Sequence, residues 1–79
     1  MGTPQLTAQQ IASRQSLAGA EMAAVCAVMA RHGLPSPYGG DGWTEMDDAA
    51  RERDALMFEQ IAIGLIDKSD RIRRGEEVE

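Results

Sequence analysis

The stretch that decides the fold is residues 17–30, LAGAEMAAVCAVMA, in which Glu21 is the only charged side chain. Alanine and methionine favour helices, and apolar residues spaced three and four apart form stripes along a helix. Several stripes run along this segment and the turns before it, so we expect a helix that is apolar on more than one side. Ile11, Ala18, Met22, Val25 and Met29 form a stripe of mostly large residues; Ser16, Ala20, Ala23, Ala27 and Ala30 form a stripe of small ones; Leu17, Ala24 and Val28 add a third apolar side.

Both ends of this first helix carry recognisable signals. Thr7 and Gln10 have the spacing of a capping box, in which each side chain accepts a hydrogen bond from the other residue's backbone N–H. Gly33 can adopt the left-handed conformation that closes a helix, and Pro35 cannot continue one. These signals predict a helix over residues 8–32.

Residues 33–42, GLPSPYGGDG, form the predicted connection. They contain two of the three prolines and four of the eight glycines in the chain, and these residues favour turns. Residues 43–46 predict a short helical turn, after which Asp47 or Thr44 would cap a second helix. A connection of this length is a candidate functional loop rather than a minimal turn.

The second helix is predicted to run from Asp47 to a stop at Gly75. Between residues 55 and 66 only Glu59 and Gln60 are polar, so this helix is also apolar on more than one side. Phe58, Ile61, Ala62 and Leu65 lie on one face; Leu56, Ile63 and Ile66 lie on another, with Met57 between the two.

The sequence therefore predicts an all-α fold, an antiparallel helical hairpin with a long Pro/Gly-rich connection and a short extra helical turn. We expect a single domain over residues 1–79, with an N-terminal extension at residues 1–6 and an acidic tail at residues 75–79. A hairpin cannot bury apolar surface on several sides of each helix, so something else must cover the remainder. The candidates are a homodimer that completes a bundle, the connection folded back, or a protein partner.

The net charge of −5 is concentrated in the middle of the chain. Residues 1–34 carry two bases against one acid, residues 35–66 carry seven acids against two bases, and residues 67–79 carry five acids against four bases. Affinity for nucleic acids rests on clustered Lys and Arg. The acidic middle therefore argues against direct binding to nucleic acid.

Cysteine usage and hydropathy indicate the compartment. Cys26 is the only cysteine, so no internal disulfide can form, as is usual in cytosolic proteins. The N-terminus shows no signal-peptide pattern. The apolar run at residues 17–30 is interrupted by Glu21 and is too short to span a bilayer. We expect a cytoplasmic protein without membrane contact.

No pattern of catalytic or metal-binding residues stands out. Cys26 and His32 are six residues apart on one helix and point in different directions, so they do not form a nucleophile–base pair. Asp41, Glu45 and the two aspartates that follow lack the alternate spacing of a calcium loop. The glycine-rich connection lacks the lysine of a phosphate loop. We expect no catalytic residue, no metal, no cofactor and no enzymatic activity.

An acidic stripe is the pattern that best predicts binding. Glu45, Asp48, Glu52 and Glu59 recur at spacings of three, four and seven along the second helix. Such a stripe is either a solvated face or a contact for a basic surface on a partner, where it would replace nucleic-acid phosphates. Trp43 would either anchor that partner or cap the hairpin core. The predicted partner-binding residues are Tyr38, Asp41, Trp43, Glu45, Asp48, Glu52 and Glu59.

One segment resembles a pattern found in short proteins of bacteriophages and mobile elements. Trp43 is followed three residues later by Met46 and five residues after that by Arg51, leading into residues 57–62, MFEQIA. With its small size, acidity and lack of chemistry, the chain is similar to anti-CRISPR proteins. The resemblance implies an inhibitor that docks on a CRISPR effector complex in the bacterial cytoplasm and blocks a surface used for nucleic acid or nuclease recruitment.

A second hypothesis places the function in the apolar helix faces. The chain would then be a homodimeric structural or regulatory protein, comparable to an antitoxin or a phage assembly accessory. Small residues such as Ala23 and Ala27 would allow the close approach on which such an assembly depends.

Overall fold

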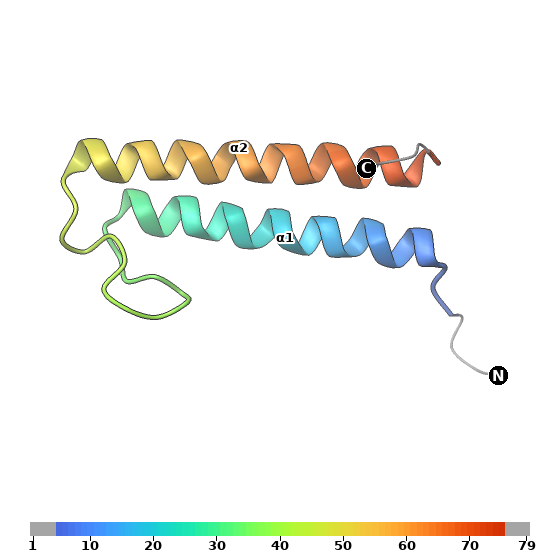
Figure 1. The fold of residues 1–79 in the computed structure, drawn as a ribbon, viewed down its shortest axis with the longest axis horizontal. Helices are drawn as coiled ribbons and strands as arrows, with labels where there is room; N and C mark the ends of the chain where they lie inside the picture. The colour runs from blue at the N-terminus through green and yellow to red at the C-terminus, as the bar shows by residue number, and fades with distance from the viewer. Residues whose placement is uncertain (1–4, 76–79) are drawn as a thin grey trace.

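Two long antiparallel helices make up the fold, as the computed structural model shows (Figure 1). The structure describes residues 5–75, so residues 1–4 of the predicted extension and residues 76–79 of the predicted tail lie outside it. Helix α1 spans Ala8–Arg31 and helix α2 spans Asp48–Arg73. The helices lie side by side along their lengths, and the connection leaves one end of the pair as an open loop (Figure 1). The predicted all-α hairpin is confirmed.

Helix α1 begins and ends through the local signals that the sequence contains. The backbone N–H of Gln10 donates to Thr7 Oγ1 at 3.0 Å, and the backbone N–H of Thr7 donates to Gln10 Oε1 at 2.8 Å. At the other end Gly33 has φ +65°, and the N–H of Leu34 donates to the carbonyl of Met29 at 3.0 Å. This is the backbone pattern that closes a helix through a left-handed glycine.

Helix α2 is capped by Asp47 rather than by Thr44. The side chain of Asp47 accepts a hydrogen bond from the backbone N–H of Ala50 at 2.8 Å. The predicted helical turn before it is a pair of hydrogen-bonded turns instead of a helix. In these turns the N–H of Thr44 donates to Asp41 at 3.1 Å, and that of Met46 donates to Trp43 at 3.3 Å.

Small side chains form the contact between the helices. The largest fully buried residues are Cys26 and Ser69, so the two backbones approach closely and little aliphatic surface is enclosed. The predicted small stripe of α1 therefore faces α2. The stripe of larger residues is exposed at Ile11, Met22 and Val25, and only its last member, Met29, packs against the core. The buried residues of the two helices are Ser13, Ser16, Ala20, Ala23, Cys26, Ala27 and Ala30 on α1, and Ala55, Ala62 and Ser69 on α2.

The face of α2 formed by Phe58, Ile61, Ala62 and Leu65 is not buried as a unit, since Ile61 is 44% exposed. The centre of the buried face runs instead through Ala55, Ala62 and Ser69, which are spaced seven residues apart. Ile61 precedes Ala62 by one residue and therefore points about 100° away from it. Small residues occupy the centre of the contact because the facing stripe of α1 is also small.

Candidate protein-interaction surface

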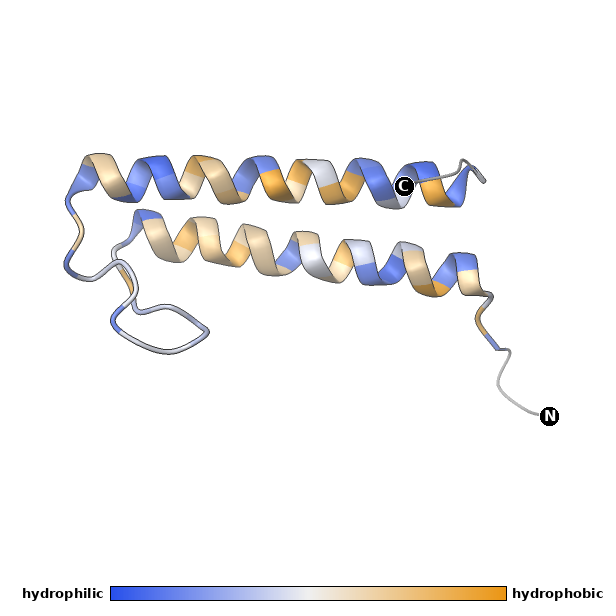
Figure 2. Cartoon of the chain, viewed as in Figure 1, coloured by the Kyte–Doolittle hydropathy of each residue, from blue (hydrophilic) through white to orange (hydrophobic). Residues whose placement is uncertain are grey.

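Large apolar side chains lie on the outside of this hairpin. Figure 2 shows hydrophobic residues along the visible sides of both helices, and not only where the helices meet. Contiguous apolar surface on a small protein usually marks an interaction site. The exposed large hydrophobic residues of the helices are Ile11, Met22, Val25 and Val28 on α1, and Leu56, Met57, Ile61, Ile63 and Ile66 on α2.

Two adjoining hollows form a groove on one side of the helix pair. Both hollows are lined by Ala24 of α1 and Ala62 of α2, so they are continuous. Alanine forms the floor of the groove, and longer aliphatic side chains from both helices rise along it. We call this surface the groove face and define it by Leu17, Ala24, Val28, Ala62, Ile63 and Ile66.

An ion-pair cluster lies at the end of the groove nearest the connection. Arg31 donates from Nε to Glu52 Oε2 at 2.9 Å and from a terminal nitrogen to Glu52 Oε1 at 2.8 Å, a bidentate pair. Its other terminal nitrogen donates to Glu59. The hydrogen bonds to Glu52, and then the bond to Glu59, raise the pKa of Arg31, while the hydrogen bonds from Arg31 lower the pKa of Glu52. Two acids of the predicted stripe are therefore engaged with α1.

The remaining acids of the stripe lie at the connection end of the molecule. The side chain of Asp48 is 99% exposed and forms an ion pair with Arg51 at 3.1 Å. Glu45 and Asp41 are exposed on the turns before α2. The four stripe residues therefore do not present one continuous acidic surface, because Glu52 and Glu59 neutralise a cation of the facing helix.

Trp43 lies in the core, not on the surface. It is 7% exposed, and its Nε1 donates to Asp54 Oδ2 at 2.9 Å. Its ring meets that of Phe58 edge-on, with centroids 5.9 Å apart and an angle of 88° between the planes. Of the two roles considered for Trp43, capping the hairpin core is therefore the one that matches its placement.

Tyr38 is the exposed aromatic residue of the connection. It is 73% exposed, and its backbone N–H donates to Ser36 Oγ at 3.1 Å. Figure 1 places this part of the connection at the same end of the molecule as the start of α2. We call this region the loop end and define it by Tyr38, Asp41, Glu45 and Asp48. Of the seven residues predicted from sequence, these four are the ones that a partner can reach without breaking contacts between the helices.

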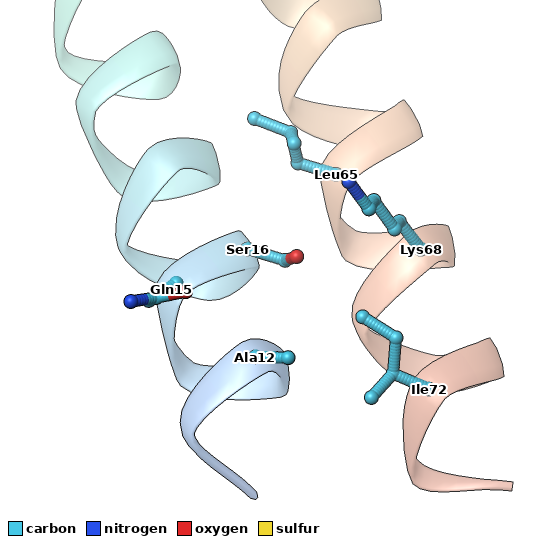
Figure 3. Close-up of a pocket in the computed structure, with 6 residues that line it drawn as sticks. All are labelled: Ala12, Gln15, Ser16, Leu65, Lys68 and Ile72. Atoms are coloured by element: carbon cyan, nitrogen blue, oxygen red, sulfur yellow. The ribbon is translucent and has the colours of Figure 1, made fainter. Parts of the chain in front are cut away.

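A third hollow lies on the side of the helix pair opposite the groove face. Figure 3 shows Leu65 and Ile72 of α2 pointing toward α1 in this region. Gln15 and Lys68 also line it, so its rim is more polar than that of the groove. We call this side the opposite face. The hollow is lined by Ala12, Gln15, Ser16, Leu65, Lys68 and Ile72.

The candidate reactive residues lie in different environments. Cys26 is 1% exposed, whereas His32 is exposed at the end of α1. Among residues 5–75 no group of three or more His, Cys, Asp or Glu side chains is placed to hold a metal ion. Neither helix of the described chain is long and apolar enough to cross a membrane.

Comparisons of the chain with protein-family models, with curated proteins and with solved structures find no match.

The sequence indicates the apolar sides of each helix, but it did not show that one side of α1 and one side of α2 lie next to each other and form the groove face. Leu17, Ala24 and Val28 were assigned to one side of the first helix, and Ile63 and Ile66 to one side of the second. The antiparallel pairing through the small residues places both sets on the same surface. The missed signal is the seven-residue spacing of small residues on α2, which fixes how that helix is rotated against α1.

Proposed function

We propose that this chain is a small protein-binding inhibitor that occupies a surface of a bacterial protein or ribonucleoprotein complex, and that it is not an enzyme. One observation carries the proposal: the helices bury Ala, Ser and Cys against each other and leave their larger aliphatic residues at the surface. A hairpin without a partner would be expected to bury its large aliphatic side chains between its helices and to expose small ones, because burial of large aliphatic groups supplies most of the stabilisation.

The loop end supports a contact with a basic partner surface. Tyr38 combines an apolar ring with a hydroxyl group, as residues at interface hot spots often do. Asp41, Glu45 and Asp48 surround it with negative charge at one end of the molecule. Complementary charges at the edge of an interface accelerate encounter and select the partner.

The proposed target is a CRISPR effector complex. This choice rests on the resemblance of the Trp43–Ala62 region and of the chain's character to anti-CRISPR proteins. An effector complex carries basic surfaces that hold nucleic acid, and an acidic loop end would compete for such a surface. In this proposal the chain acts on the protein component and does not bind nucleic acid itself.

Capture by purified effector complexes tests the proposal directly. The chain would be immobilised and exposed to individual CRISPR effector complexes at low ionic strength, where charge contacts are strongest. We expect one class of effector to be retained and to be released as salt rises. Failure of every effector to bind at low salt would reject the target.

A pair of charge reversals tests the loop end. Glu45→Lys reverses the charge of an exposed acid of the loop end, and Asp67→Lys reverses that of an exposed acid of α2 far from it. Among residues 5–75 Asp67 pairs only within α2, with Arg71 at 4.0 Å, so its reversal leaves the contacts between the helices in place. We expect Glu45→Lys to weaken capture and Asp67→Lys to leave it unchanged, with equal helicity by circular dichroism. Equal effects of the two variants would exclude a role for the loop end. Glu52 is unsuited to this test because its reversal would break the pair with Arg31.

A second candidate function is a homodimeric structural or regulatory protein, such as an antitoxin-like factor or a phage accessory. The observation that favours it is the continuous apolar groove between Ala24 and Ala62. A dimer that retains no effector complex would support this second candidate over the first.

A further inference from the structure

We propose that a second copy of this chain covers the groove face, so that two hairpins form a four-helix dimer. The proposed loop-end contact with a basic target lies at another part of the molecule, so it can hold or fail independently of the dimer. The dimer rests on the second candidate function, the homodimer, and deepens it by naming the face through which two copies meet.

The small core of the single hairpin is the first argument for the dimer. The largest side chains that are fully buried are Cys26 and Ser69, and a chain of 79 residues is marginally stable even with a well-filled core. A partner that stabilises the hairpin must be present whenever the chain is folded. A second copy is available wherever the chain is made, at a level set by the concentration of the chain itself, whereas a foreign target is not.

The size of the hairpin face that holds the groove is the second argument. The groove face, which runs from Leu17 to Val28 on α1, is the central part of this larger face. The helices contain 24 and 26 residues, so the shorter one is about 36 Å long at 1.5 Å per residue. Two packed helices present a face about 20 Å wide, which gives a surface of about 700 Å². A stable protein–protein interface buries about 800 Å² on each partner. One face of the hairpin therefore matches what a dimer needs.

The composition of the groove face is the third argument. Its floor is alanine and its ridges are Leu, Val and Ile, which allow the ridges of one copy to pack into the groove of the other. Charged groups stand at its rim, where Glu21 and Glu59 line the two hollows. An apolar centre with a polar rim is the usual composition of an interface. On the opposite face the hollow is instead lined in part by Gln15 and Lys68.

Two matched substitutions in α1 test the dimer. Ala24 lies in the groove face and Ala18 lies on another side of the same helix, and both are exposed in the single hairpin. Each becomes a glutamate three residues from Glu21, so helix propensity and local charge change alike. By sedimentation equilibrium we expect the parent chain and Ala18→Glu to have twice the chain mass of 8.5 kDa, and Ala24→Glu to be monomeric. A monomeric parent chain, or a dimer that survives Ala24→Glu, would overturn the proposal.

A second measurement applies if Ala24→Glu fails to fold as a monomer. Nitroxide labels would be attached at Ala24→Cys or at Ala18→Cys in a Cys26→Ala background, and distances between copies would be measured by pulsed electron resonance. We expect the label at position 24 to give the shorter distance, because that position faces the partner copy. A shorter distance at position 18 would place the interface elsewhere and reject the groove face.

Discussion

Trp43 ties the connection to both helices. Its backbone N–H donates to the carbonyl of Leu34 at 3.2 Å, which closes the loop at its base. Its carbonyl accepts a hydrogen bond from Arg51 at 3.2 Å, and its ring packs against Phe58. One residue therefore fixes where the connection leaves α1 and where it enters α2.

The hydrogen bond from Trp43 to Asp54 predicts the effect of Trp43→Phe. Phenylalanine retains an aromatic ring but removes the donor, and it leaves the carboxylate of Asp54 without this partner. A hydrogen bond to a charged group contributes about 1.5–3 kcal/mol, so we expect a loss of about that size in the free energy of unfolding. Urea denaturation followed by circular dichroism measures it, with Tyr38→Phe as an exposed control. Equal midpoints for the two variants would contradict the role of the indole N–H.

Two glycines of the connection differ in what surrounds them. Gly42 has φ +58°, and a Cβ added there would lie 2.2 Å from the backbone N of Ser36. Gly40 has φ +77°, but nothing lies within 4 Å of its added Cβ. Both positions carry the left-handed strain of a side chain, and only Gly42 adds a collision with backbone.

This difference predicts unequal effects of the same substitution. Gly40→Ala should lower the free energy of unfolding by about 1–2 kcal/mol, the cost of a left-handed alanine. Gly42→Ala should lower it further, because the turn near Ser36 must open. Thermal melts of the two variants give the comparison. A Gly42→Ala variant as stable as Gly40→Ala would mean that the connection can shift at no cost.

The contact between α1 and α2 is built for close approach. Ala23 is 6% exposed and faces α2, whereas Ala18 is exposed on another side of α1. We expect Ala23→Leu to destabilise the hairpin by about 1–3 kcal/mol, the usual cost of overpacking. Ala18→Leu should leave stability unchanged. Chemical denaturation of both variants measures this, and equal stabilities would show that the helices are not in tight contact. The substitution at Ala23 therefore tests the hairpin itself, not its assembly with other chains.

The ends of the elements could be predicted from sequence because their causes are local. The capping box at Thr7 and Gln10 and the closing glycine at Gly33 each involve residues within one turn of each other. The Pro/Gly-rich connection is recognisable for the same reason. Which side of α2 is buried was harder, because more than one of its stripes satisfies a helical period. The packing of α1 selects Ala55 and Ala62 over Ile61, and that information lies outside α2.

The candidate site shows the same division between local and long-range causes. The exposure of Tyr38 and Asp48 could be predicted, because a loop tip and the first residue of a helix face solvent. The pairing of Glu52 and Glu59 with Arg31 could not, since the residues lie 21 and 28 positions apart in the chain. The two helical glycines show the same dependence on packing: a Cβ added at Gly19 would lie 3.1 Å from Leu65, whereas nothing lies within 4 Å of one added at Gly64.

The molecule as a whole is a flat layer of two helices with apolar residues on both sides. A dimer through the groove face would cover one side of each hairpin and leave both loop ends exposed. Two loop ends on one particle could engage two sites of a large complex, which raises the effective affinity without new contacts. The loop-end contact of the inhibitor proposal and the groove face of the dimer proposal are therefore separate surfaces of one fold, and the two contacts are compatible.

The ion pairs of Arg31 link the ends of the two helices nearest the connection, and they predict a pH dependence of the whole fold. The bond from Arg31 holds the pKa of Glu52 below its ordinary value of 4.5 in the folded state. A carboxyl group with a lowered folded-state pKa stabilises the fold above its unfolded pKa, and this stabilisation is lost as pH falls through the folded pKa. It is therefore complete at neutral pH and declines below about pH 4.5.

A comparison of Arg31→Gln with Arg14→Gln isolates this contribution. Each variant removes one positive charge from α1, so the general effect of net charge on stability is the same in both. Arg14 is exposed and forms no ion pair within residues 5–75. We expect Arg31→Gln to be the less stable variant at neutral pH. The difference in stability should shrink as the pH falls through the folded-state pKa of Glu52. Urea midpoints of both variants, determined at a series of pH values, measure this difference. A difference that stays constant into the acid range would show that the stability lost with Arg31 comes from packing of its side chain, because packing does not titrate with Glu52.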